Sequence, residues 1–159
     1  MSHTDPYVSL LTTHYEEIYR FCLHFLGSRA EAEDVTQEVF IKAFQSLDSV
    51  REEGATRGWL YSIARNCCID KKRWWKRYLT FLHRGREEGV DQGMGELSLT
   101  LSKLISELPE RQREIFILRH FHDFSTEDTA QLLNISPGTV KSHLKRAVDS
   151  LKKALEKDN

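Results

Sequence analysis

The chain has 159 residues, 40% of them hydrophobic and 30% charged, and its formal net charge is −1. These values fit a globular protein of one average domain or two small ones, and they exclude a disordered chain. No apolar run approaches the roughly 20 residues that span a bilayer, and the N-terminus lacks the pattern of a secretory signal, so we expect a cytoplasmic protein without membrane insertion.

Apolar residues at intervals of three and four predict two amphipathic helices before residue 46. The first should end at Gly27, because glycine readily adopts the left-handed conformation that closes a helix. Ser28 should cap the second, with Glu31 three residues later. The predicted inner faces comprise Tyr15, Ile18, Tyr19, Cys22, Phe25 and Leu26 in the first helix, and Ala32, Val35, Val39, Phe40, Ala43 and Phe44 in the second.

The outer face of the second helix is acidic. Four acids and no base lie between Glu31 and Glu38. A Glu38–Lys42 pair at helical spacing would stabilise the helix only modestly. From the residues alone, this surface is either an ordinary solvated face or a docking face for a basic partner.

A polar segment with two glycines, DSVREEGATRG at residues 48–58, predicts a loop. A third helix follows, beginning at Thr56 or Arg57 and running to the Trp74–Trp75 pair. We expect Trp59 to pack in the core, and one of the two adjacent tryptophans to be exposed.

The third helix combines positive charge with aromatic rings. Between Arg65 and Arg77 it has six basic residues and a single acid, Asp70. Surfaces of this kind bind single-stranded nucleic acid, because the cations contact the phosphates and the aromatic rings stack on the bases. Asn66, Asp70 and Arg73 share one stripe of the helix, and Asn and Arg can read base edges. The helix therefore favours nucleic-acid binding over the alternative of a solvated basic face.

The best domain boundary is the segment RGREEGVDQGMG at residues 84–95, which has four glycines and no apolar periodicity. Two more amphipathic helices are predicted after it, at residues 97–108 and 109–121. No segment alternates as a strand would. The predicted fold is all-α, with two small helical domains joined by a flexible linker.

Residues 125–153 predict a helix, a tight turn and a second helix. Ser125 can cap the first helix, and Asn134 tolerates the left-handed conformation of the turn. Ser136 and Pro137 suit the cap and first position of the second helix. This helix has basic and polar residues near its start, as expected of a DNA-reading helix that enters the major groove by its N-terminal residues. An ordinary helical hairpin is the alternative.

Catalytic and metal-binding patterns are weak. His120 and His122 are two apart, so they point away from each other on a helix, and only a loop would bring them and Asp123 together. Cys22, Cys67 and Cys68 lack the spacing of a zinc site or a disulfide framework. We therefore expect no catalytic residue, no metal and no cofactor, with buried thiols and a minor alternative of redox sensing.

Four segments together resemble the extracytoplasmic-function (ECF) group of alternative bacterial RNA polymerase sigma factors. They are AEDVTQEVFIKAF, GWLYSIARNCCIDKKRWW, LPERQREIFILRHF and NISPGTVKSHLKRA, which follow one another from Ala32 to Ala147. The resemblance covers nearly the whole chain. It implies a sigma region 2 domain at residues 1–83, a linker at 84–96 and a sigma region 4 domain at 97–159.

The resemblance also implies a role for each segment. The acidic helix would dock on the β′ clamp helices of core RNA polymerase through Asp34, Gln37, Glu38 and Phe40. The third helix would bind the minus-10 element, and the loop before it would capture a flipped base of that element. The residues implied are Arg51, Arg57, Tyr61, Arg65, Asn66, Asp70, Lys72, Arg73 and Lys76. The last helix would bind the minus-35 element through Pro137, Gly138, Thr139, Lys141, Ser142, His143, Lys145 and Arg146.

The implied function is that of a non-enzymatic factor that directs core polymerase to a two-part promoter and assists its opening. Residues 108–121 would help dock on the β flap, and the implied partners are core RNA polymerase, promoter DNA and an anti-sigma factor, with a monomer when free. Thr129 and Asn134 depart from the family's usual aliphatic residue and glycine. A stand-alone helix-turn-helix regulator, a protein that titrates another factor and a metal-dependent enzyme are the alternatives.

Overall fold

A computed structural model describes residues 5–47, 55–82 and 96–157, and within them the chain forms seven helices and no strand. The all-α prediction is confirmed. The helices are α1 (Pro6–Leu26), α2 (Arg29–Gln45), α3 (Thr56–Leu82), α4 (Glu96–Ser106), α5 (Glu110–Phe121), α6 (Thr126–Leu133) and α7 (Pro137–Lys157). No helix in these ranges has the length and apolarity to cross a membrane.

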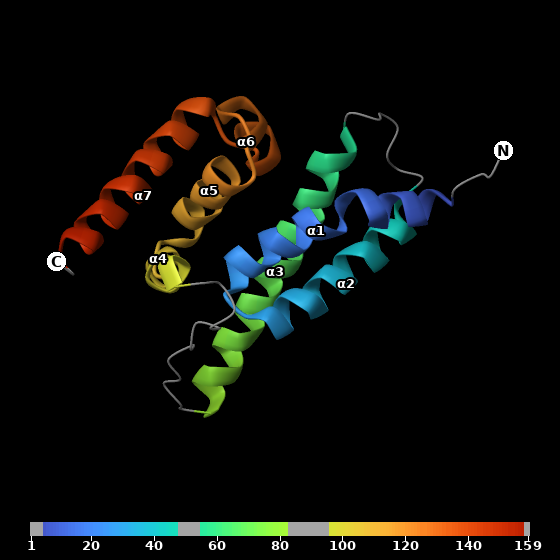
Figure 1. Cartoon of the computed structure of the whole chain (residues 1–159), viewed down its shortest axis with the longest axis horizontal. Helices are drawn as coiled ribbons and strands as arrows, with labels where there is room; N and C mark the ends of the chain where they lie inside the picture. Colours follow the sequence, from blue (N-terminus) through green and yellow to red (C-terminus); the bar gives the residue numbers. More distant parts are fainter. Residues whose placement is uncertain (1–4, 48–54, 83–95, 158–159) are drawn as a thin grey trace.

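Helices α1, α2 and α3 form one bundle (Figure 1). Asp5 caps α1 by accepting a hydrogen bond from the Tyr7 backbone N–H at 2.9 Å, and Gly27 closes the helix at a φ of 73°. Ser28 then caps α2, as predicted. The core between the three helices contains fully buried Ile18, Phe21, Val39, Leu60 and Ala64.

Two predicted features of this bundle are wrong. Phe44, placed on the inner face by its spacing, is 55% exposed, and its ring packs at a tilt against Tyr7, with centroids 4.6 Å apart. It lies in the last turn of α2, where the spacing still repeats but little of the bundle remains to cover it. The third helix does not stop at the tryptophan pair but continues to Leu82.

Helices α4 to α7 form the second half of the molecule, with α7 packed along α5 and α6 (Figure 1). The helix-turn-helix has the predicted caps. The Ser125 hydroxyl accepts from the Asp128 N–H at 2.9 Å, Asn134 adopts a φ of 55°, and the Ser136 hydroxyl accepts from the Thr139 N–H at 3.1 Å. Buried Val140, Ala147 and Leu151 hold α7 against its neighbours.

The two halves pack against each other through α1 and α3 on one side and α5 and α6 on the other. The predicted linker lies outside the described residues except for Glu96, where α4 begins. The mutual packing positions the α3 surface, which the sequence marks for nucleic acid, beside α5.

Candidate nucleic-acid interface

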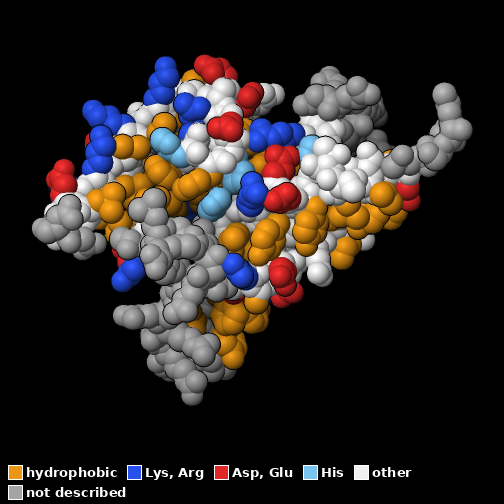
Figure 2. All heavy atoms as spheres, in the orientation of Figure 1, with side chains coloured by type: hydrophobic (Ala, Val, Ile, Leu, Met, Phe, Trp, Pro, Cys, Tyr) orange, Lys and Arg blue, Asp and Glu red, His pale blue; other side chains and the backbone are white. Residues whose placement is uncertain are grey.

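The start of α7 presents a basic surface. Lys141, Ser142, Lys145 and Arg146 are exposed, as are Pro137 and Gly138 just before them, whereas Thr139 and His143 are half-buried. Figure 2 shows Lys and Arg side chains gathered along the outer edge of this helix. Because the opposite face is buried, the cations are held on a rigid element, which suits insertion into a groove of DNA.

The predicted stripe on α3 lines a cleft between the two halves. The cleft has a volume of about 520 Å³. Its walls are Arg65, Asn66, Ile69, Asp70 and Arg73 of α3 and Glu110, Arg111 and Glu114 of α5. Three carboxylates offset three guanidinium groups, so the cleft offers little net attraction to the phosphates of a DNA strand.

Arg65 is engaged with the second half of the molecule. Its Nε lies 3.1 Å from Oε1 of Glu114, which is 1% exposed, and Arg111 approaches the other carboxylate oxygen at 3.4 Å. Burial raises the pKa of Glu114 despite these two cations. A buried carboxylate is strongly destabilising without a partner, so this contact ties α3 to α5.

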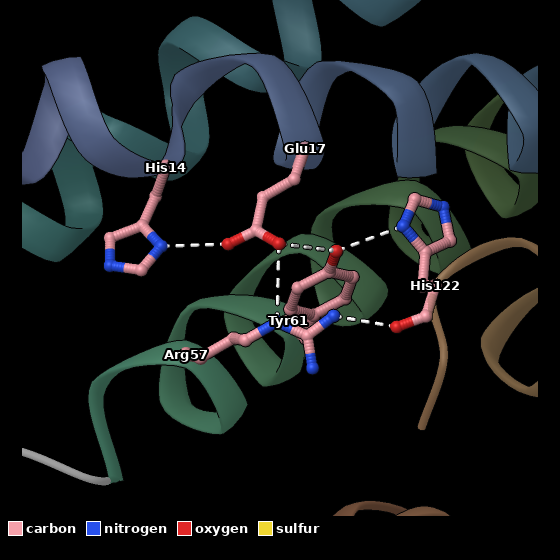
Figure 3. A network of polar contacts seen from close by, with 5 residues as sticks. All are labelled: His14, Glu17, Arg57, Tyr61 and His122. Carbon is pink, nitrogen blue, oxygen red and sulfur yellow. Dashed lines mark hydrogen bonds and ion pairs between the residues drawn. The ribbon is translucent and has the colours of Figure 1, made fainter. Parts of the chain in front are cut away.

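A second polar network joins Glu17 of α1, Arg57 and Tyr61 of α3, and His122 after α5 (Figure 3). Arg57 donates to the Glu17 carboxylate at 3.1 Å and to the His122 carbonyl at 2.6 Å. The Tyr61 hydroxyl lies 3.2 Å from Glu17 and 2.9 Å from Nδ1 of His122. Tyr61 is fully buried, so these contacts lie in the interface between the halves.

When His122 is neutral, the hydroxyl and imidazole protons of this network each have a hydrogen-bond acceptor. Its Nδ1–H then donates to the Tyr61 hydroxyl, which donates to the Glu17 carboxylate, and Nε2 is enclosed without a hydrogen-bond partner. Burial opposes the ionisation of Glu17, but hydrogen bonds from His14 and Arg57 outweigh it and lower the Glu17 pKa. Burial raises the pKa of Tyr61, which keeps the hydroxyl a donor.

The buried histidine predicts a loss of stability in mild acid. Burial lowers the pKa of His122 to about 4. The positive charges of His24, Arg57 and Arg20 also lower this pKa, and the Glu17 carboxylate opposes the shift. Between its ordinary pKa of 6.5 and this value, the unfolded chain takes up a proton that the folded chain does not, so stability falls as pH falls. At about 1.4 kcal/mol per pKa unit, we expect a loss of about 2 kcal/mol between pH 7 and pH 5.

Urea unfolding at pH 7 and pH 5 measures this loss directly. His122→Asn should flatten the pH dependence, although burial also lowers the pKa of His24, whose share remains. His120→Asn is the matched control, because His120 is exposed and two residues away. A His122→Asn variant whose stability still falls as steeply as that of the unmodified chain would contradict the assignment.

The outer face of α2 is available to a partner. Asp34, Gln37 and Glu38 are exposed, and Glu38 forms the predicted ion pair with Lys42 at 3.0 Å. Phe40, predicted at this site, is 1% exposed and stacks on Tyr15, so it supports the helix from the core. Ile41 and Phe44, which are exposed beside this face, were not among the predicted docking residues.

Apolar side chains adjoin the exposed polar face of α2. Ile41 and Phe44 are each 55% exposed, and Figure 2 shows hydrophobic side chains in a row over α1 and α2. An apolar centre with a polar rim is typical of protein interfaces. The one available signal in the sequence was Ile41, an apolar residue on an otherwise polar stripe.

The other predicted residues are placed as follows. Asn66, Asp70, Arg73 and Lys76 are exposed, and Lys72 is half-buried with its Nζ 5.8 Å from the centre of the Phe25 ring. Arg51 lies outside the described residues. A pocket of about 380 Å³ adjoins the start of α3 and is lined by Lys42, Gln45, Ser46, Trp59, Ile63, Asn66 and Cys67. Trp59 is half-buried at its edge.

The metal-site alternative does not match the arrangement of the histidines. His122 is enclosed by aromatic rings, among them Phe21 and Tyr61 with ring centres 5.6 and 5.4 Å away, while His120 is exposed and packs on Phe116. Within the described ranges, no three His, Cys, Asp or Glu side chains are grouped to hold a metal ion. The three cysteines are buried free thiols, and burial raises the pKa of Cys67 to about 11.

Comparison with known families gives two matches along the chain. Residues 10–78 match the model of "Sigma-70 region 2", and residues 98–151 match that of "Sigma-70, region 4". The chain is 33% identical to the ECF RNA polymerase sigma factor SigW of Bacillus subtilis, over 95% of this chain and 89% of that protein. It is 29% identical to the RNA polymerase sigma factor SigV of the same organism, over 96% and 92%.

Solved structures share the fold over nearly the full length. The sigma factor RpoE of Bartonella quintana, in complex with the anti-sigma factor NepR, superposes with a TM-score of 0.84 at 25% identity, over 98% of this chain and 100% of that chain. CnrH, in complex with the cytosolic domain of CnrY, superposes with a TM-score of 0.72 at 23% identity, over 96% of this chain and 89% of that chain.

Proposed function

This chain belongs to the ECF RNA polymerase sigma factors, and from that premise we propose which of its surfaces bind core polymerase and which bind the two promoter elements. As a sigma factor it is a transcription initiation factor that directs core RNA polymerase to promoters, not an enzyme. We assign residues 1–83 to core docking and the minus-10 element, 84–96 to a linker, and 97–159 to the minus-35 element.

The observation that carries the assignment is the helix-turn-helix of α6 and α7. Its caps at Ser125 and Ser136 fix the turn, and buried Val140 and Ala147 orient α7 so that its N-terminal cations face solvent. In our assignment α7 lies in the major groove of the minus-35 element. The DNA contacts are made by Pro137, Gly138, Thr139, Lys141, Ser142, His143, Lys145 and Arg146.

The docking face for core polymerase is on α2. Asp34, Gln37 and Glu38 supply polar contacts, and Ile41 and Phe44 supply apolar area. Exposed acids beside exposed apolar side chains fit a basic partner surface with an apolar centre, such as a pair of clamp helices. Residues 108–121 would contact the β flap, once α5 leaves the other half of the chain.

The minus-10 element is assigned to α3 and the loop before it. Asn66, Arg73 and Lys76 are exposed and can reach a strand without rearrangement. Arg57, Tyr61 and Arg65 are engaged with the second half of the molecule. Their use on DNA therefore requires the two halves to separate when the chain binds polymerase. We also assign Asp70, which is exposed, and Lys72, which is half-buried over the Phe25 ring of α1, to this element. We assign Arg51 with the loop.

We also propose an anti-sigma partner and a cytoplasmic location, where core polymerase works. Support comes from the likeness to RpoE bound to NepR, which extends over both halves of this chain. A partner that binds the packed arrangement and not the separated one would shift the population toward the inactive state. The free chain is proposed to be a monomer.

Run-off transcription tests the proposed function. Purified chain and core polymerase are incubated with fragmented DNA from the source organism, and the chain is omitted in the control. We expect discrete transcripts that require the chain. Binding to core without any transcript would favour a protein that titrates another factor, and tight binding to duplex DNA without core would favour a stand-alone regulator; either result would overturn the proposal.

A further inference from the structure

Two histidines face each other where the halves of the molecule meet, and neither has a role in the proposed function. His122, after α5, is 6% exposed, and its ring centre lies 5.6 Å from that of His24 on α1. His24 in turn stacks on Phe121, with ring centres 4.3 Å apart. The rings of Phe21 and Tyr61 lie edge-on to His122 and complete the enclosure. These two residues, His24 and His122, are called here the histidine pair.

A second proton on His122 has no acceptor in the packed arrangement. Nδ1 faces the Tyr61 hydroxyl at 2.9 Å and carries the proton of the neutral ring (Figure 3). A further proton must go to Nε2, which is enclosed and has no hydrogen-bond partner among the described residues. Nδ1 of His24 is enclosed and unpartnered within the same ranges. Because a buried cation without a partner is costly, the packed arrangement favours two neutral rings.

The charges around His122 also oppose its protonation. The charged and titratable groups that face it are Glu17, Arg20 and His24 of α1 and Arg57 and Tyr61 of α3, while its neighbour Asp123 is exposed. Arg20 and Arg57 are cations, and a protonated His24 is a third. Glu17 attracts an imidazolium, but its carboxylate already accepts hydrogen bonds from Arg57 and Tyr61.

Proton uptake therefore favours separation of the halves, because a separated histidine pair is hydrated. Burial, and then the surrounding cations, lower the pKa of His122 from 6.5 to about 4, and burial lowers that of His24. A lowered pKa stabilises packing above pH 6.5, and this stabilisation is lost as the pH falls toward 4. For His122 alone, these values raise the equilibrium constant for opening about twentyfold between pH 7 and pH 5.

Opening would release α3 residues that the packed arrangement withholds. Arg57, Tyr61 and Arg65 each contact the second half of the molecule. We propose that the histidine pair is an acid-sensitive latch, which holds the two halves of the free chain together when neutral and releases them when protonated. The latch would control access to the α3 residues assigned to the minus-10 element, and this consequence rests on the proposed function.

Single-molecule energy transfer in the full-length free chain tests the latch. Glu33→Cys on α2 and Lys152→Cys on α7 provide one exposed dye position in each half, and the three native cysteines are buried. Molecules with low transfer efficiency are counted as open. We expect the ratio of open to packed molecules to rise about twentyfold between pH 7 and pH 5, while circular dichroism retains its helical signal.

Substitutions of the histidines identify the groups responsible. His122→Asn should remove most of the rise in the open fraction and leave the share of His24. His122→Gln repeats the test with a longer neutral side chain, in case the asparagine loosens the packing at pH 7. His120→Asn is the matched control, because His120 is exposed and should leave the full rise.

Two results would overturn the latch: an open fraction that does not change with pH, or an equal rise in the variants that lack the His122 imidazole. Opening that accompanies loss of the helical signal would be unfolding and would also overturn it. The run-off assay separates this proposal from the proposed function. Opening in acid through His122, in a chain that directs no transcription, would retain the latch and reject the function. Transcription by a chain that stays packed in acid would do the reverse.

Discussion

Replacing Lys141 or Arg146 by alanine should lower transcription from a cognate promoter about tenfold each, while affinity for core polymerase stays within about twofold. Both side chains are exposed on the N-terminal half of α7. A good contact to a base edge is worth about 1–3 kcal/mol, and tenfold corresponds to about 1.4 kcal/mol. Alanine keeps the helix, so the loss reports the contact and not the fold.

The matched control for this prediction lies on the same helix. Lys152 is also exposed, but it lies about 16 Å further along α7 from Lys141. Lys152→Ala removes the same charge from the chain and should leave transcription within about twofold. Loss of core binding in the Lys141 or Arg146 variant would reject the assignment of α7 to DNA.

The second large effect is expected from Asp34→Lys, which should weaken binding to core polymerase about thirtyfold. Asp34 is exposed on the face of α2 that also presents Gln37, Glu38 and Ile41. Reversing its charge places a cation against a basic partner surface, and like charges at an interface cost several kcal/mol. Titration of fluorescently labelled chain with core polymerase measures the change.

Glu33→Lys is the control for charge alone. Glu33 is exposed and adjacent in sequence, but it points about 100° around the helix from Asp34. It makes the same change in net charge and should reduce affinity less than threefold. Equal losses of affinity in the two variants would mean that only the overall charge matters. An unchanged affinity of Asp34→Lys for core polymerase would contradict the proposed docking face on α2.

Local features of the fold were predictable because their physical cause lies within a few residues. The Ser125 and Ser136 caps and the left-handed Asn134 each depend on a hydrogen bond or backbone preference of their immediate neighbours. The buried stripes of α1, α2 and α7 follow from helical spacing. Phe44 shows the limit, because spacing alone does not say where the covering helix ends.

The arrangement of the two halves was not predictable in the same way. Tyr61 and His122 are 61 residues apart, and their hydrogen bond needs both halves to be in place. Nothing near Arg65 in the sequence marks Glu114 as its partner. Family resemblance therefore assigned Arg57, Tyr61 and Arg65 to DNA binding, whereas in the structure these residues contact the second half of the molecule.

This engagement has a consequence for activity. Separating the halves gives up the buried Arg65–Glu114 contact and the Tyr61 network, so polymerase and promoter must supply at least that free energy in return. In the proposed arrangement, two modest DNA contacts held on one polymerase gain from a high effective concentration, so we expect separation to become favourable only in the assembled complex.

The most direct test of this account compares Asp34→Lys with Lys141→Ala in one experiment that records both core binding and promoter-specific transcription. We predict that Asp34→Lys binds core weakly and recovers transcription when core is raised to saturation. Lys141→Ala should bind core normally and stay defective at every core concentration. The opposite pattern, or the same pattern in both variants, would contradict the division between docking on α2 and promoter recognition by α7.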